Sequence, residues 1–251
     1  MPERNQIWDA TFLKESPSLR GIAEVVKYFA GFSRWPTLDE YTAYVEARRQ
    51  RFAPACAPVR FVEAKPKRHR APKTQPISLT ALYDGSISLC SEVPCFHESY
   101  HDLFNVLIWA AFPQSKRALH ARQFRALSAW VPKGATRLPG ARTREQDALT
   151  VFDEGGSVVI VSDDPNISPQ IFLFGHALLE HALYHRPKVR SSALILKACE
   201  PSLDDEARLA WVDSSVCERL NSQASFQAPG VDGVLEIAED GSSKLFPHAP
   251  P

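Results

Sequence analysis

The feature that most constrains this chain is a run of apolar residues over 103–112, which only Asn105 interrupts and Pro113 ends. The run predicts a helix over 99–111 that is apolar on nearly every face. Such a helix has to be covered by other elements, so we expect it at the centre of a folded core. It is too short to cross a membrane, which takes about 20 consecutive apolar residues.

The segments around this helix carry signals for further helices and for short strands. Capping boxes at Thr37 and Thr143 and prolines at positions 113 and 169 mark helix starts. Helices are predicted over 18–33, 37–52, 114–130, 143–154, 170–185 and 204–221, and buried strands over 157–162 and 192–199. A strand over 148–152 is an alternative to the helix over 143–154.

These elements predict an α+β fold, a mainly helical single domain with a small β-sheet. The length is sufficient, because 251 residues with 44% hydrophobic content can bury one large core. Along the chain we expect an N-terminal helical segment, a proline-rich basic loop or linker, a core domain and an irregular C-terminal tail. These parts cover residues 1–52, 53–76, 77–221 and 222–251.

The balance of charge excludes one class of protein. The 29 basic and 29 acidic side chains give a formal net charge of zero, so the whole surface cannot serve as a cation for nucleic acid. Two basic stretches, 65–73 and 116–125, could still contact RNA or an acidic partner. The first lacks the interleaved aromatic side chains that favour RNA binding, and ordinary solvated surface explains it as well.

The cysteines and the N-terminus bear on the compartment. Five scattered cysteines do not form the pattern of a disulfide-stabilised secreted protein. The N-terminal residues lack the apolar core of a signal peptide, and no segment is long enough to span a membrane. We therefore expect a cytoplasmic protein with no membrane contact.

Polar residues inside apolar helices are the clearest sign of a site, because a buried polar group is costly unless it is paired. His101 and Asn105 lie four residues apart, which places both on one face of the apolar helix. His176 and Glu180 repeat this spacing in a second apolar segment. Two carboxylates, at 153–154, come at the end of a third apolar segment. The polar residues of any one segment are more typical of a buried hydrogen-bond network. Taken together, the polar residues of all three segments could also line one pocket.

Histidines and carboxylates in this pattern suit a divalent metal or an acid–base pair, so we hypothesise a metal-dependent hydrolase, for example one that cleaves a phosphoester. The metal would be zinc, manganese or magnesium. The alternative from another class is a non-enzymatic binding or scaffold protein, in which the same residues lock helix contacts. The hydrolase hypothesis assigns His101, Asp102, His176 and Glu180 as metal ligands, Asp153 or Glu154 as general base or further ligand, Asn105 as the residue that orients a ligand or the substrate, and Arg144 as the binder of an anionic group.

A literal HExxH motif at 97–101 offers a second metal hypothesis. On a helix this spacing places two zinc ligands on one face with a general-base glutamate between them, as in zinc metalloproteases. Pro94 and the acidic Asp102 argue against it, because the motif then falls at a helix start and is followed by a charged residue. The third ligand would have to come from elsewhere, for example from Glu180 or Asp153.

Three blocks of the sequence occur in a fixed order: HDLFN at 101–105 with Trp109, Phe112, Pro113 and Lys116 after it, DALT at 147–150 with FDE at 152–154, and FGHALLE at 174–180. Together they resemble the signature of a bacterial family catalogued as domain of unknown function 3025. The resemblance implies no activity, but it centres on the HDxFN segment and so makes the HExxH motif a local coincidence. The tail after Ser222 departs from the ending that the resemblance implies.

Overall fold

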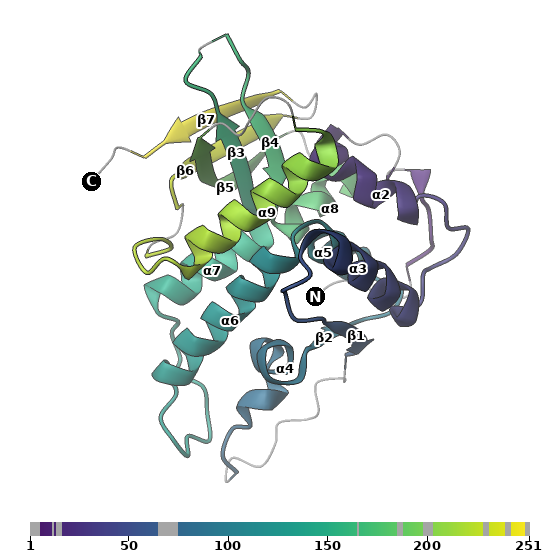
Figure 1. The fold of residues 1–251 in the computed structure, drawn as a ribbon. Helices are drawn as coiled ribbons and strands as arrows, with labels where there is room; N and C mark the ends of the chain where they lie inside the picture. Colours follow the sequence, from purple (N-terminus) through teal and green to yellow (C-terminus); the bar gives the residue numbers. More distant parts are fainter. Residues whose placement is uncertain are drawn as a thin grey trace.

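The computed structural model describes residues 6–11, 13, 17–64, 75–164, 166–184, 188–197, 203–227, 231–238 and 242–248 (Figure 1). Over these ranges the chain has an α+β fold that is mainly helical, as predicted. The helical elements are η1 (Pro17–Ile22), α2 (Ala23–Phe29), α3 (Leu38–Phe52), η2 (Leu79–Ala81), α4 (Tyr83–Cys90), α5 (Tyr100–Ala111), α6 (Pro113–Trp130), α7 (Arg144–Gly155), α8 (His176–Tyr184) and α9 (Asp205–Asn221), of which η1 and η2 are 3₁₀-helices. The strands are β1 (Arg60–Glu63), β2 (Glu92–Cys95), β3 (Gly156–Val161), β4 (Gln170–Leu173), β5 (Lys188–Lys197), β6 (Gly233–Ala238) and β7 (Ser243–Pro247).

The strands form two sheets of unequal size. The described residues of the larger sheet give the strand order β4-β3-β5-β6-β7, in which β3 and β5 run parallel and the other neighbours run antiparallel. A short parallel pair, β1 and β2, lies next to α4. Figure 1 shows the larger sheet at the top of the molecule and the pair β1–β2 near the bottom, with helices between them.

The apolar run at 103–112 forms the predicted central helix. α5 begins after Ser99, whose hydroxyl accepts a hydrogen bond from the backbone N–H of Asp102, and every residue from position 102 to position 111 is buried. Helices α3, α6 and α8 pack against it. A helix that is apolar on every face has to be buried on every face, and elements from both halves of the chain bury α5.

The start of α6 is fixed to α9 by one buried carboxylate. Asp213 of α9 accepts hydrogen bonds from the backbone N–H groups of Gln114 and Ser115, at 3.0 and 2.8 Å. These N–H groups belong to the first turn of α6 and have no partner within the helix. Burial raises the pKa of Asp213 to about 6. The contact sets the position of α6, which carries several residues of the site described below.

The prediction of a helix over 170–185 is wrong for its first residues. Residues Gln170–Leu173 form β4, which pairs antiparallel with β3, and α8 begins only at His176. Ile171 and Phe172 favour strands, and the edge of β3 offers them a partner that local periodicity does not reveal. The helical remainder still carries His176 and Glu180 one turn apart.

The irregular tail predicted over 222–251 is also wrong, because its described residues include β6 and β7. The residues of β6 alternate between buried and half-buried, which is the pattern of a strand that packs on one face. The alternating segment is short, and the glycine, aspartate and proline residues around it are typical of irregular structure. The sequence therefore predicted no strand here.

Other differences are smaller. The predicted helix over 18–33 divides into η1 and α2, and β5 begins at Lys188 rather than at position 192. The alternative strand over 148–152 is wrong, because the Thr143–Gln146 capping box forms and α7 is a helix. The loop predicted over 53–76 contains β1, and its residues 65–74 lie outside the described residues. The elements α4 and β2 lack a clear sequence signal.

The basic stretch 65–73 thus lies outside the described residues, while the stretch 116–125 lies on α6. Lys116 and Arg122 are buried, and Arg117 donates hydrogen bonds to the carbonyls of Ile87 and Pro58. Most cations of this stretch therefore act inside the fold. Contact with RNA or an acidic partner stays a prediction, as does the cytoplasmic location.

Within the described ranges, none of the helices combines the length and the apolar character that crossing a membrane requires.

Candidate metal centre

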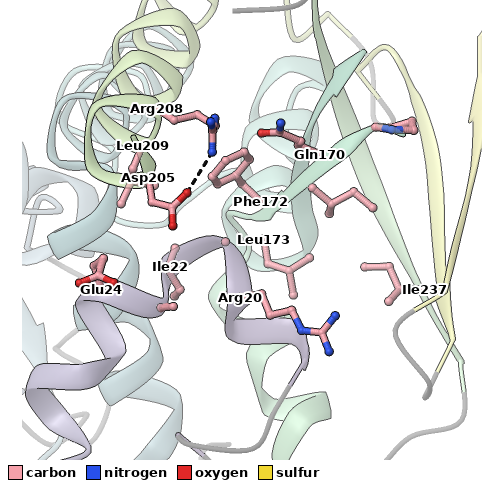
Figure 2. A pocket seen from close by; sticks show the side chains of 14 residues that line it. Arg20, Ile22, Glu24, Gln170, Phe172, Leu173, Asp205, Arg208, Leu209 and Ile237 are labelled. Carbon is pink, nitrogen blue, oxygen red and sulfur yellow. Dashed lines mark hydrogen bonds and ion pairs between the residues drawn. The ribbon is translucent and has the colours of Figure 1, made fainter. Parts of the chain in front are cut away.

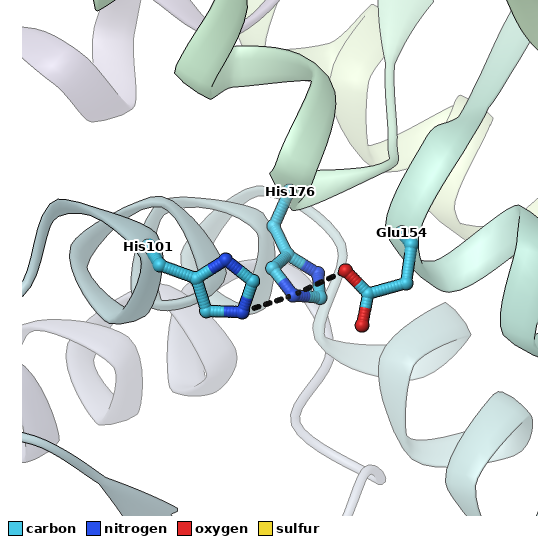
Figure 3. Close-up of side chains that lie close together, drawn as sticks. All are labelled: His101, Glu154 and His176. Atoms are coloured by element: carbon cyan, nitrogen blue, oxygen red, sulfur yellow. Dashed lines mark hydrogen bonds and ion pairs between the residues drawn. The ribbon is translucent and has the colours of Figure 1, made fainter. Parts of the chain in front are cut away.

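Two histidines and a glutamate from three helices meet at one point (Figure 3). His101 lies in the first turn of α5, Glu154 in the last turn of α7, and His176 is the first residue of α8. Nε2 of His176 lies 3.3 Å from Nε2 of His101 and 3.3 Å from Oε2 of Glu154. One potential ligand atom from each residue lies within 4.8 Å of the other two, so a single cation can contact all three.

The second ring nitrogen of each histidine has a partner outside this cluster. Nδ1 of His101 lies 2.5 Å from Oε1 of Glu180, and Nδ1 of His176 lies 2.9 Å from the backbone carbonyl oxygen of Asp153. A carbonyl oxygen only accepts hydrogen bonds, so Nδ1 of His176 carries the proton. Metal-ligating histidines characteristically have such an acceptor on the nitrogen that does not bind the metal, because it fixes the tautomer and the ring orientation.

The two imidazoles differ in their affinity for protons. Burial lowers the pKa of His176 to about 3, and the nearby charge of Asp153 opposes this only in part. Burial also acts to lower the pKa of His101, but the hydrogen bond and the charge of Glu180 outweigh it and raise the pKa above 6.5. His176 is therefore neutral at pH 7, and its Nε2 directs a lone pair at His101 and Glu154.

The charge around the cluster favours a cation. Burial and the charge of Asp153 raise the pKa of Glu154, and the nearby positive charges of His101 and Lys116 oppose this only in part. The carboxylate of Glu180 lies on the opposite side of His101. A divalent ion between the three ligand atoms would neutralise this negative charge and use both imidazole lone pairs.

A close backbone approach at Gly175 brings α8 to the end of α7. Gly175 N–H donates a hydrogen bond to the carbonyl of Gly156 at 2.8 Å. A Cβ atom at Gly175 would lie 2.4 to 2.6 Å from backbone atoms of Gly156, Gly155 and Glu154. Because these distances are too short for any side chain, glycine at this position allows His176 to lie beside Glu154.

We expect Gly175→Ala to destabilise the fold by about 1–3 kcal/mol, the usual cost of overpacking, because the backbone of two elements has to move apart. Gly155→Ala is the matched control, since a Cβ there meets no atom within 4 Å. Urea denaturation of both variants measures the difference. Equal stability of the two variants would contradict the role assigned to Gly175.

A buried ion pair lies directly behind His176. Nζ of Lys116, on α6, lies 2.5 Å from Oδ1 of Asp153, and the lysine side chain is fully buried. Burial acts to raise the pKa of Asp153, but the charge of Lys116 outweighs it, so the pKa lies well below its usual value. Asp153 therefore uses its carboxylate to hold Lys116 and its carbonyl to orient His176, instead of acting as a free base.

A cavity of about 600 Å³ opens beside the cluster. His101, Glu154 and His176 line it together with Asp102, Asn105 and Arg142. Helices α5, α6 and α7 supply much of its wall, and the start of α4 and the loop between α6 and α7 complete it. The volume falls within the range of about 300–1,000 Å³ that is usual for small-molecule sites.

The other predicted ligands lie next to the cluster, not in it. Asp102 lines the cavity, and its carboxylate accepts a hydrogen bond from the backbone N–H of Phe96 at 3.2 Å. Glu180 holds the outer nitrogen of His101. Glu154, predicted as a base or a further ligand, offers the third potential ligand atom of the cluster.

The remaining predicted residues divide between the cavity and the surface. Asn105 lines the cavity, where its Nδ2–H donates a hydrogen bond to the hydroxyl of Tyr83 at 2.9 Å. Arg144 is exposed at the first position of α7 and does not line the cavity. Arg142, two residues earlier, does line it, so it is better placed to hold an anionic group.

The HExxH segment does not have the geometry of a zinc protease. Ser99 is the N-cap of α5, so His97 and Glu98 precede the helix, and Glu98 has a left-handed φ of 59°. Both side chains are 40% exposed, and Nδ1 of His97 lies 3.7 Å from Oε1 of Glu98. Of this motif, only His101 contributes to the metal cluster.

A second cavity, of about 390 Å³, lies between η1, β4 and the start of α9 (Figure 2). Its wall includes Arg208, which donates a hydrogen bond to Oδ1 of Asp205 at 3.0 Å. None of the described residues that line it is a histidine or a cysteine. It therefore lacks the imidazole ligands that line the first cavity.

Comparison with known proteins identifies a family for part of the chain. Residues 72–171 match the model of a family described as protein of unknown function (DUF3025). The matched range contains His101 and Glu154 and ends before His176. No curated protein and no solved structure matches the chain. The family description assigns no activity, so function has to be inferred from the geometry of the site.

Proposed function

We propose that this protein, which carries a DUF3025 domain over residues 72–171, is a hydrolase that binds one divalent metal ion through His101, Glu154 and His176. The proposal rests on one observation, the convergence of two imidazole nitrogens and a carboxylate oxygen within 4.8 Å beside a cavity. Three separate helices contribute to it, and each imidazole is already oriented by an acceptor on its other nitrogen.

The donor set supports a catalytic metal over a structural one. Two histidines and one carboxylate are typical of zinc hydrolases, in which three protein ligands leave a coordination position for water or substrate. Structural zinc sites usually have four protein ligands and favour thiolates. Imidazoles suit zinc and other transition metals better than magnesium, which prefers oxygen, so zinc is the first ion to test, with manganese and magnesium as alternatives.

The residues around the ion can be given roles in hydrolysis. The bound ion supplies a Lewis acid that activates water and polarises the group under attack. Among the aspartates that line the cavity, Asp153 is paired with Lys116 and Asp84 with His120, so we assign Asp102 as the general base. Arg142 can hold an anionic group, which supports a phosphoester as the substrate.

Hydrolysis assays before and after metal removal test this function. The purified protein would be assayed on phosphomonoester, phosphodiester and carboxylic-ester substrates, metal-free and reloaded with zinc, manganese or magnesium. We expect turnover of a phosphoester only with metal. Glu154→Gln should abolish it, and the matched change Glu98→Gln in the HExxH segment should not.

Turnover that survives complete metal removal would contradict the proposal, as would loss of activity in Glu98→Gln alone. A folded protein that retains no metal and hydrolyses none of these substrates would support the binding or scaffold alternative instead.

Glu180 should tune the affinity for the metal without binding it. We expect Glu180→Gln to lower zinc affinity by about 10–100-fold, because the neutral amide is a weaker acceptor for His101 Nδ1. Glu218→Gln, on the exposed face of α9, is the control and should leave affinity unchanged. Competition with a chromophoric chelator measures both; unchanged affinity in Glu180→Gln would show that this carboxylate does not act on the site.

A further inference from the structure

Exposed apolar side chains gather at the mouth of the metal-site cavity. Tyr83, Trp130 and Leu138 are 39%, 47% and 46% exposed, and all three line this cavity. They come from the start of α4, the end of α6 and the loop over 131–143. Leu82 and Leu127 add half-buried apolar surface to the same wall. Apolar surface that is concentrated at a cavity, and not scattered, is characteristic of ligand binding.

Hydrogen bonds hold this apolar mouth in place. Nε1 of Trp130 donates to the carbonyl of Ala141 at 3.2 Å, which ties the end of the loop over 131–143 to α6. The backbone N–H of Ile77 donates to the carbonyl of Ala135 at 2.8 Å, which ties the same loop to the segment before α4. A wall that is already ordered loses little conformational entropy when a ligand binds.

The apolar mouth continues inward into polar surface. Gln123, Leu127 and Trp130 are spaced for one face of α6, and all line the cavity. Polar side chains, among them Asn105 and Arg142, line the cavity together with the metal cluster. A ligand that fills this space therefore has a polar reacting end and an apolar group beside it.

We propose that the substrate carries an aryl group next to its hydrolysable anionic group, and that Tyr83, Trp130 and Leu138 bind this aryl group. The inference rests on the function proposed above. Two of the three side chains are aromatic and can contact a ring by stacking or edge to face. A cavity of about 600 Å³ has room for a group of one or two rings beside the metal cluster.

A pair of phosphonates tests this preference without turnover. Zinc-loaded protein would be titrated by calorimetry with phenylphosphonate and with methylphosphonate, which share the anionic group and differ in the apolar one. We expect phenylphosphonate to bind at least about tenfold more tightly. In Trp130→Ala and in Leu138→Ser the ratio should fall below about threefold, with zinc affinity unchanged.

Two further variants separate the possible causes. Trp130→Phe removes the hydrogen bond to Ala141 but keeps a ring, so it should retain most of the preference. Phe246→Ala removes an aromatic side chain on β7 that is 42% exposed and lies outside the cavity, so it should change nothing.

Equal affinity for the two phosphonates, no binding of either, or a preference that survives both mouth variants would overturn this inference and leave the metal site standing. Failure of the protein to bind zinc would instead overturn the proposed function, and the aryl preference with it.

Discussion

Replacing His176 with alanine is expected to lower zinc affinity by on the order of 10²–10³-fold, a larger loss of affinity than the one expected for Glu180→Gln. Nε2 of His176 lies 3.3 Å from both other ligands, so its loss leaves His101 and Glu154 as an incomplete pair. A structural zinc site with four ligands contributes about 10–16 kcal/mol, so one ligand accounts for roughly 2.5–4 kcal/mol. Competition against a chromophoric chelator at fixed pH measures the loss.

The control for this variant is His97→Ala, which removes an exposed histidine of the HExxH segment and should leave zinc affinity unchanged. His176 is buried, so circular dichroism has to show that its variant still folds. Unchanged affinity in a folded His176→Ala protein, or an equal loss in His97→Ala, would contradict the ligand assignment.

Replacing Lys116 with methionine is expected to lower the free energy of unfolding by about 3–5 kcal/mol. Methionine has a similar volume, so the cost comes from the carboxylate of Asp153, which is left charged and buried without its partner. Because the carbonyl of Asp153 orients His176, zinc affinity should also fall. Urea denaturation of the metal-free protein isolates the effect on stability.

Two comparisons show whether the ion pair is the cause. In the double variant Lys116→Met, Asp153→Asn the buried charge is absent, so it should be more stable than Lys116→Met alone. Arg125→Met removes an exposed cation from the same helix and should change stability by no more than about 0.5 kcal/mol. If the double variant were as unstable as the single one, lost packing and not lost charge would explain the effect.

The sequence predicts the helices best where their signals are local. The capping boxes at Thr37 and Thr143 form as expected, and the run at 103–112 is the buried centre of the fold. The errors fall at β4, β6 and β7, where short segments become strands because each pairs with a neighbouring strand: β4 with β3, β6 with β5 and β7 with β6. Local periodicity contains no information about such partners.

For the candidate site, the sequence predicts the residue types better than their roles. The i, i+4 spacing identifies His101 and His176, and the resemblance to the family draws attention to the same segments. Spacing cannot show that Glu180 contacts Nδ1 of His101 while Glu154 contacts Nε2 of His176, because this depends on how α5, α7 and α8 meet.

Two residues that shape the site were not assigned to it from the sequence. Lys116 shares a face of α6 with Leu119 and His120, and a cation on an apolar face is a signal for a buried ion pair. Gly175, directly before His176, acts through the close approach of two backbones. Only the three-dimensional structure reveals that contact.

X-ray absorption spectroscopy of the zinc-loaded wild-type protein, combined with its metal content, tests the central claim most directly. We predict one zinc ion per chain, bound by two imidazole nitrogens at about 2.0–2.1 Å and by oxygen for the rest of its coordination shell. A protein that retains no zinc would contradict the claim. A shell that contains sulfur or fewer than two imidazoles would contradict it equally, because the cluster of His101, Glu154 and His176 offers two imidazoles, one carboxylate and no sulfur.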